Sequence, residues 1–196
     1  MKQDFLWDDL VIREAEADDY KKIFQLTEKA FKKYEQKISG ADRDHLQETV
    51  CDVKEDIDRQ VVLILEKKDT AVGCLRLKQL SAMEELTSEG LSSFRRKAGG
   101  EFLLRRFAID PDLQGQGYGS ILLEAAEDRV KAEGGEKIYL FSSLENKRLT
   151  SFYRRHGFSC LLVDENKGYR RGLWEKYLKT GADENETMGR PFSGRN

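Results

Sequence analysis

The sequence predicts a single domain of the α/β (α+β) class, in which helices flank a mixed sheet. Its 196 residues are enough to bury a sizeable core around such a sheet. Continuous apolar runs such as Val61 to Leu65 are typical of buried strands. Other segments repeat their apolar residues at helical spacing, which indicates amphipathic helices. No internal repeat is visible, so the two patterns are assigned to one domain.

The first half of the chain is predicted to form three strands and two helices. Val11 to Arg13 reads as a short strand, and Asp18 or Asp19 caps the helix that follows. The buried face of this helix has six members: Tyr20, Ile23, Phe24, Thr27, Phe31 and Tyr34. A second helix buries Leu46, Val50, Val53 and Ile57. The strand Val61 to Leu65 then turns at Lys67 to Thr70 and returns as the strand Ala71 to Leu77.

The second half is predicted to alternate strands with two more helices. A long strand, Glu101 to Ile109, comes first. The next helix carries its apolar residues at helical spacing and stops at Gly134-Gly135; these residues are Tyr118, Ile121, Leu122, Ala125, Ala126 and Val130. A buried strand, Ile138 to Phe141, precedes a short helix after Glu145. Phe158 to Val163 and Gly172 to Leu178 close the sheet.

Two segments break this compact pattern. Leu80 to Gly100 mixes scattered apolar residues with many charges, and it is interpreted either as a helical lid or as a mobile surface connection. The last residues, 180–196, are polar, charged and rich in glycine, and are predicted to be disordered. The folded domain is therefore expected to span residues 1–179.

Overall charge excludes a general electrostatic attraction to polyanions. The chain has 34 basic and 36 acidic residues, with a pI near 5.9. No nucleic acid and no anionic membrane are therefore expected as partners. The pairs Arg105-Arg106, Arg154-Arg155 and Arg170-Arg171 are interpreted as solvated faces or salt-bridge partners, some of them within reach of a ligand's phosphates.

Cysteine usage and the absence of long apolar runs predict a cytoplasmic protein. The three cysteines, Cys51, Cys74 and Cys160, are odd in number and are not paired with histidines at metal-ligand spacing, so no metal is expected. Cys74 and Cys160 fall in apolar strands, where cysteine usually acts as a small buried hydrophobe. Neither a hydrophobic signal core nor a run of membrane-spanning length is present in the sequence.

The most informative segment is the run Gln114 to Ser120, which places three glycines before the amphipathic helix. Glycine lets the backbone adopt positive φ and approach a ligand closely, so that successive N–H groups turn toward an anion. The N-terminus of the following helix adds its dipole. The segment therefore predicts a site for a diphosphate, and its alternative is a tight turn without a ligand.

The glycine spacing excludes two common nucleotide-binding motifs. A phosphate-binding NTPase loop needs Gly-Lys-Ser/Thr, and this tripeptide does not occur in the sequence. The run Gly115, Gly117 and Gly119 reads G-x-G-x-G, and it lacks the third glycine at the interval that a dinucleotide-binding turn requires.

Two blocks of sequence resemble the GCN5-related N-acetyltransferase (GNAT) family. Gln114, Gly117 and Gly119 fill that family's loop pattern Gln/Arg-x-x-Gly-x-Gly/Ala, and Arg105 to Pro111 is similar to its central strand and exit. The later block matches its second motif through Glu145-Asn146, Leu149, Phe152-Tyr153 and Gly157-Phe158. The family's element order can be followed from Leu10 to Leu178, and the specific part is Glu101 to Phe158.

This resemblance implies a mostly antiparallel sheet with splayed central strands. It also implies transfer of an acetyl group from acetyl-CoA, the cosubstrate, to a primary amine by direct attack in a ternary complex without a metal. The acceptor would be an amine-bearing small molecule or a protein, and a homodimer is compatible with the family. Two alternatives stay open: a CoA-sensing or peptide-binding module without turnover, and an acyl donor other than acetyl-CoA.

The resemblance also assigns roles to residues. Tyr153 would protonate the departing thiolate, unless it only packs with Leu149 and Phe152 at helical spacing. Glu101 is the candidate base because strand alternation gives it the face of Phe107; its alternative is an ordinary surface glutamate. Asn146 would bond the pantetheine arm and also cap a helix. The expected cofactor-binding residues are Phe107, Ala108, Ile109, Gln114, Gly115, Gln116, Gly117, Tyr118, Gly119, Ser120 and Asn146.

Overall fold

The computed structural model describes residues 9–35, 47–80, 100–165 and 168–178. Its strands are β1 (Leu10–Glu14), β2 (Val61–Lys67), β3 (Thr70–Gln79), β4 (Glu101–Ile109), β5 (Lys137–Ser143), β6 (Ser159–Asp164) and β7 (Arg171–Tyr177). Its helices are α1 (Tyr20–Glu35) after a short 3-10 turn, η1 (Ala17–Asp19), then α2 (Val50–Arg59), α4 (Tyr118–Ala132) and α5 (Lys147–Arg155). Leu46, most of the segment 80–100 and the tail 180–196 lie outside the described residues.

The described strands form one mixed sheet in the order β1-β2-β3-β4-β5-β7-β6. Neighbouring strands run antiparallel except β4 and β5, which are parallel. Helix α4 makes the crossover between these two strands, as a parallel connection requires. The predicted class, a mostly antiparallel sheet flanked by helices, is confirmed.

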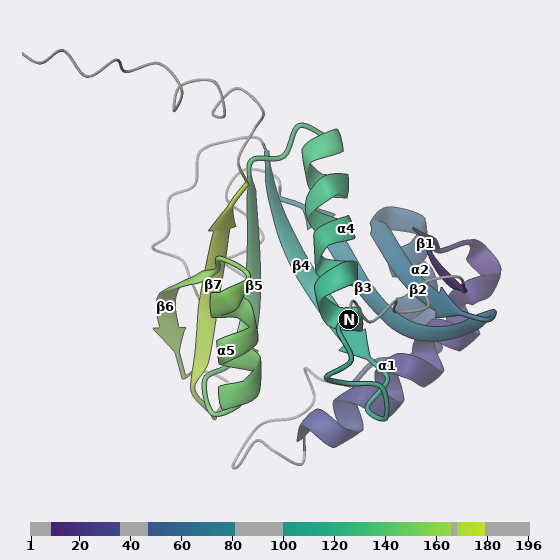
Figure 1. Cartoon of the computed structure of the whole chain (residues 1–196), viewed down its shortest axis with the longest axis horizontal. Helices are drawn as coiled ribbons and strands as arrows, with labels where there is room; N and C mark the ends of the chain where they lie inside the picture. Colours follow the sequence, from purple (N-terminus) through teal and green to yellow (C-terminus); the bar gives the residue numbers. More distant parts are fainter. Residues whose placement is uncertain (1–8, 36–46, 81–99, 166–167, 179–196) are drawn as a thin grey trace, which may run out of the picture.

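The central strands separate along their length. β4 pairs with β5 only from Glu101 to Leu104, opposite Lys137 to Leu140. Beyond this point the two strands diverge toward α5, as Figure 1 shows. The predicted splay is therefore confirmed, and the sheet has an opening between the second half of β4 and the end of β5.

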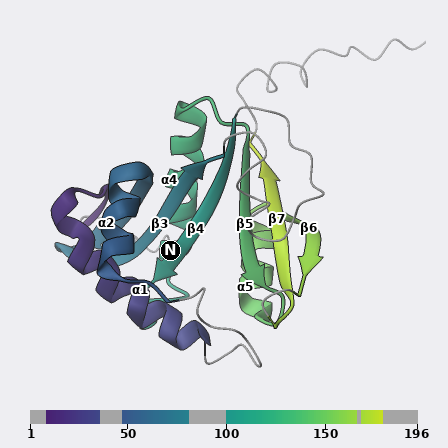
Figure 2. The same ribbon diagram turned by 180° about the vertical axis from the view of Figure 1, so that it is seen from behind.

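Helices cover the two faces of the sheet from opposite sides (Figures 1 and 2). One face packs on α4 and α5, where Leu122, Ala126 and Val130 are fully buried against residues of the central strands. The other face packs on α1 and α2 through Ile23 and Val53. The opening between β4 and β5 is consequently flanked by helices from both faces.

Local signals explain how several elements begin and turn. Lys68 and Asp69 join β2 to β3 with φ values of 50° and 61°, the left-handed pair that a tight two-residue hairpin needs. The Thr49 hydroxyl accepts a hydrogen bond from the Asp52 amide at 3.2 Å and caps α2. Asn146 caps α5 in the same way, as predicted, because its Oδ1 accepts from the Leu149 amide at 3.2 Å.

Two sequence predictions about side chains are wrong. The helical segment that leads into α1 is capped at Glu16, which precedes both Asp18 and Asp19, because the Asp19 carboxylate accepts a hydrogen bond from the Glu16 amide at 2.8 Å. Cys160 is exposed, since it lies on the edge strand β6. Cys74 is buried as predicted.

Gly135, which follows α4, is required by packing. A Cβ at this position would lie 2.3 Å from Val130 Cγ1, 2.7 Å from Phe102 Cε2 and 2.8 Å from the Val130 carbonyl oxygen. We expect Gly135→Ala to lower the free energy of unfolding by about 1–3 kcal/mol, the usual cost of overpacking. Urea denaturation measures this change, and an unchanged midpoint would mean that the α4–β5 connection relaxes freely.

Candidate active site

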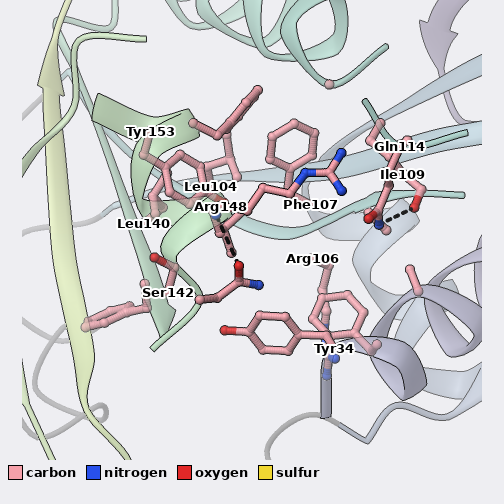
Figure 3. Close-up of a pocket in the computed structure, with 18 of the residues that line it drawn as sticks. Tyr34, Leu104, Arg106, Phe107, Ile109, Gln114, Leu140, Ser142, Arg148 and Tyr153 are labelled. Atoms are coloured by element: carbon pink, nitrogen blue, oxygen red, sulfur yellow. Dashed lines mark hydrogen bonds between the residues drawn. The ribbon is translucent and has the colours of Figure 1, made fainter. Parts of the chain in front are cut away.

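A cavity of about 490 Å³ occupies the opening between β4 and β5. Its volume lies in the usual range for small-molecule sites. Side chains from α1, β4, β5, α5 and the loop before α4 line it, so both helical layers contribute. In Figure 3, Tyr34 and Arg106 lie on one side of this cavity, and Tyr153, Phe107 and Arg148 on the other.

A bulge in β4 sets which side chains face the cavity. Arg106 has a φ of 49°, and the register between β3 and β4 shifts there. Leu104 and Phe107, on either side of the bulge, therefore both pack on the α4 face, whereas Leu103 and Ala108 pack on the opposite face. Phe107, Ala108 and Ile109, three of the predicted cofactor-binding residues, line the cavity.

Glu101 does not line the cavity. The prediction that it shares a face with Phe107 is wrong, because the bulge reverses the alternation between them. Glu101 lies at the closed end of the opening, with its carboxylate 3.3 Å from the Tyr139 hydroxyl and 3.4 Å from Lys137 Nζ. Its side chain is buried, so the alternative of an ordinary surface glutamate is wrong as well.

The glycine loop forms one wall of the cavity. Gly115 and Gly117 have φ values of 89° and 92°, and Gly117 is the N-cap of α4. The amides of the first helical turn therefore point out of the helix N-terminus, where an anion is favoured. The lining residues from this segment are Gln114, Gly115, Gly117, Gly119 and Ser120.

Two residues of the predicted loop do not line the cavity. Gln116 is exposed, and Tyr118 is buried with its hydroxyl 2.9 Å from Lys67 Nζ. Gln114 supports the loop instead of only facing a ligand, because its Nε2 donates to the Ile109 carbonyl at 3.3 Å (dashed in Figure 3).

Two arginines of α5 add positive charge beside the loop. A Cβ on Gly115 would lie 2.9 Å from Arg148 Nη2, so this guanidinium sits directly against the loop backbone. Arg155 also lines the cavity, and both side chains are exposed. A guanidinium over a helix N-terminus suits phosphate recognition. Sequence reasoning placed Arg155 in a surface pair and missed Arg148, which has the charge but no distinctive spacing.

Helix α5 is fastened to α4 next to the loop. His156 Nδ1 lies 2.8 Å from the Phe152 carbonyl, so this nitrogen carries a proton and donates it. His156 Nε2 lies 3.0 Å from Ser120 Oγ at the start of α4. The contact explains His156 as a structural link between the two helices.

Tyr153 is buried beneath the cavity with its ring among other aromatic rings. The ring centroids of Phe158 and Trp174 lie 5.7 and 6.1 Å from its own. Within the described part of the chain its hydroxyl has no hydrogen-bond partner, although Tyr153 lines the cavity. Burial, with a smaller contribution from Tyr34, raises the pKa of this phenol, so the hydroxyl is protonated at physiological pH.

Tyr34 reaches the cavity from the opposite face. Its hydroxyl accepts a hydrogen bond from the Ser143 amide at 3.0 Å, which ties α1 to the end of β5. Phe31 and Tyr169 pack around it. Burial raises the pKa of Tyr34, although the bond from Ser143 opposes this. The sequence placed Tyr34 on a core face, because helical spacing does not distinguish a core residue from a cavity wall.

The described residues contain no group of three or more His, Cys, Asp or Glu side chains placed to hold a metal ion. None of the described helices is long and apolar enough to cross a membrane.

Several solved structures share this fold. The PaiA N-acetyltransferase of Thermoplasma acidophilum, solved in complex with coenzyme A, is 19% identical, with a TM-score of 0.66 over 86% of this chain and 98% of its own. The ribosomal-protein-S18-alanine N-acetyltransferase of Escherichia coli is 17% identical, with a TM-score of 0.60 over 88% and 96%. N-acetylglutamate synthase of Neisseria gonorrhoeae is 20% identical, with a TM-score of 0.64 over 91% of this chain and 36% of its own.

Sequence comparison gives the family. An uncharacterized N-acetyltransferase of Methanocaldococcus jannaschii is 38% identical over 50 residues, which is 26% of this chain and only 22% of that relative. The acetyltransferase (GNAT) family model matches residues 14–158, which is most of the chain and includes the glycine loop and α5. The predicted resemblance is therefore confirmed, and the protein belongs to the acetyltransferase (GNAT) family.

Proposed function

We propose that the protein transfers an acetyl group from acetyl-CoA to a primary amine by direct attack within a ternary complex. The observation that carries this proposal is a cavity that reaches through the splayed sheet. The glycine loop and the α5 arginines, which suit phosphate binding, line it on one face of the sheet, and side chains of α1 line it on the other. Such an opening lets two substrates meet from opposite sides. The PaiA and N-acetylglutamate synthase structures, both solved with coenzyme A, support the choice of donor.

The donor would lie along the α4 and α5 face. The amides of Gly117 to Gly119, at the N-terminus of α4, and the Arg148 guanidinium, beside the loop, would bind the diphosphate. Beyond Leu104, the edge of β4 that faces β5 is not paired with that strand. Its backbone groups near Phe107 and Ala108 are available to the amides of a pantetheine arm, and Asn146 lines the same channel.

The acceptor would enter from the α1 face and attack the thioester carbonyl as a neutral amine. An ammonium ion has no lone pair, so a proton must leave before attack. The described lining residues include no carboxylate and no imidazole, and we therefore propose that water carries this proton away. When the tetrahedral intermediate collapses, the C–S bond breaks and the thiolate takes the proton of the Tyr153 hydroxyl. The nitrogen of the new amide loses its extra proton, and the Tyr153 oxygen regains one through water.

The decisive experiment measures free thiol released from acetyl-CoA with a panel of primary amines, and identifies the products by mass spectrometry. We expect thiol release that depends on the added amine, together with a product heavier by one acetyl group. Parallel reactions with succinyl-CoA and longer acyl-CoA donors test the donor. Binding of acetyl-CoA without any acetylated product would instead favour a CoA-sensing or peptide-binding module.

A further inference from the structure

The acceptor side of the cavity is lined by several cationic side chains. Its described cationic side chains are Lys33, Arg105, Arg106 and Arg171, and they stand among the aromatic rings of Phe31, Tyr34, Phe141 and Tyr169. No aspartate or glutamate is among the described lining residues. An acceptor with several positive charges would therefore be repelled, while one with a negative group beside its amine would be attracted.

Two of these cations already have partners. Arg171 forms a buried ion pair with Asp164, with Nη2 2.6 Å from Oδ2. Arg106 donates to the Gln47 carbonyl at 3.0 Å, and its Nε lies 3.4 Å from Glu48. Their charges are balanced within the protein, so they form the wall without requiring a ligand anion.

Arg105 differs from them in its position. It lies directly after Leu104, the last β4 residue paired with β5, and therefore at the vertex of the opening. Its partner across the β3–β4 ladder is Arg76, whose side chain bonds Asp56 of α2. Directly opposed residues of antiparallel strands point to the same face. Arg105 therefore projects to the α1 and α2 face, where the acceptor would enter.

The charge of Arg105 is not balanced by an ion pair. Glu48, Asp52, Glu55 and Asp56 line a second cavity that Arg105 also borders, but Arg76 bonds Glu48 and Asp56, and Arg106 approaches Glu48. Among the described residues, the Arg105 guanidinium has neither an ion pair nor a hydrogen bond. The N–H groups of this half-buried guanidinium, which lies where β4 and β5 separate, are thus available to bind a ligand.

We propose that the acceptor carries a carboxylate that Arg105 binds, as a free amino acid does. This inference rests on the proposed acetyl transfer. The planar guanidinium bonds a carboxylate through two parallel N–H groups, which fixes the orientation of the molecule as well as its affinity. Such an acceptor presents its amine toward the open part of the cavity, while polyamines and aminoglycosides meet no carboxylate among the described residues that line it.

The test uses matched acceptors that differ in one group: phenylalanine against phenethylamine, and lysine against cadaverine, with spermidine as a polycation. Thiol release gives kcat/KM for each acceptor. We expect kcat/KM for the acid of each pair to exceed kcat/KM for its decarboxylated amine about tenfold or more, the range for a hydrogen bond to a charged group. Arg105→Gln should remove this preference by raising KM for the acid. Arg105→Lys should restore part of the preference. KM for acetyl-CoA should stay unchanged.

Arg59→Gln serves as the matched control, because Arg59 is an exposed guanidinium that pairs with Glu55 on the surface of α2. It should leave the acid preference intact. Binding of the same acceptors to the CoA complex is measured by calorimetry in parallel, so that the inference is tested even if no acetyl group moves. Amine-independent CoA binding without product counts against the proposed transfer alone.

Three results would overturn the inference about Arg105. They are equal or better use of the decarboxylated amines, an acid preference that survives in Arg105→Gln, and a panel in which no carboxylate either binds or reacts.

Discussion

Tyr153→Phe is expected to lower kcat by roughly ten- to a thousandfold, the usual scale for loss of a general acid. The substitution keeps the ring, whose contacts with Phe158 and Trp174 hold it in the core, and removes only the hydroxyl. Stability and acetyl-CoA affinity should therefore stay near wild type. Single-turnover kinetics with a verified acceptor separates the chemical step from product release.

Tyr20→Phe provides a matched control, since Tyr20 packs under Lys54 at the start of α1 and does not line the cavity. It should leave kcat unchanged. If Tyr153→Phe turned over as fast as wild type while chemistry limits the rate, Tyr153 would be a packing residue and water the proton donor.

The pH dependence of kcat gives a second readout of the same group. Burial raises the pKa of Tyr153, so the folded enzyme keeps this proton at pH values where an exposed phenol, with a pKa of about 10, begins to lose it. The Tyr153 phenol therefore stays protonated throughout the neutral and mildly alkaline range. We expect no decline of kcat below about pH 10 from this group.

Gly117→Val is expected to weaken acetyl-CoA binding strongly, by about tenfold or more if one or two backbone hydrogen bonds to the diphosphate are lost. A valine side chain disfavours the φ of 92° that Gly117 adopts at the N-cap of α4. The space around Gly117 is empty, with no atom within 4 Å of an added Cβ. The side chain would thus project where a ligand approaches.

Gly134→Val is the control at the other end of the same helix. Gly134 also has a positive φ, 73°, and no atom within 4 Å of an added Cβ, but it lies outside the cavity. Both variants should lose similar stability by thermal unfolding, and only Gly117→Val should lose affinity in calorimetry. Equal affinity in both folded variants would remove the glycine loop from the proposed donor site.

The sequence predicted local structure best where a residue type has one main structural role. Glycines before an amphipathic helix predicted the loop and the start of α4, and the Asn146 cap followed from its side chain. The cap of the first helix was missed because glutamate is an uncommon N-cap, whereas the aspartates that follow Glu16 are common ones. Residue preference alone therefore placed the cap at the end of η1 instead of before it, although α1 itself does begin directly after Asp19.

The site was harder to predict because the backbone geometry of the strands decides which side chains face the cavity. The β4 bulge falls at Arg106, where no glycine announces a left-handed residue, so simple alternation assigned Glu101 to the wrong face. Tyr34 has the spacing of a core residue and Arg105 that of a surface pair. Their common location appears only once the splay of β4 and β5 places α1 beside the opening.

Helix α5 carries both Arg148, beside the glycine loop, and Tyr153, beneath the opening. Five residues of α-helix separate them by about 7.5 Å along the axis, and the Ser120–His156 contact holds this helix against α4. In the proposed reaction, α5 therefore fixes the distance between the guanidinium that binds the diphosphate and the hydroxyl that protonates the sulfur. An acyl donor whose arm between diphosphate and sulfur is longer or shorter than that of CoA would bind with its sulfur out of reach of the Tyr153 proton.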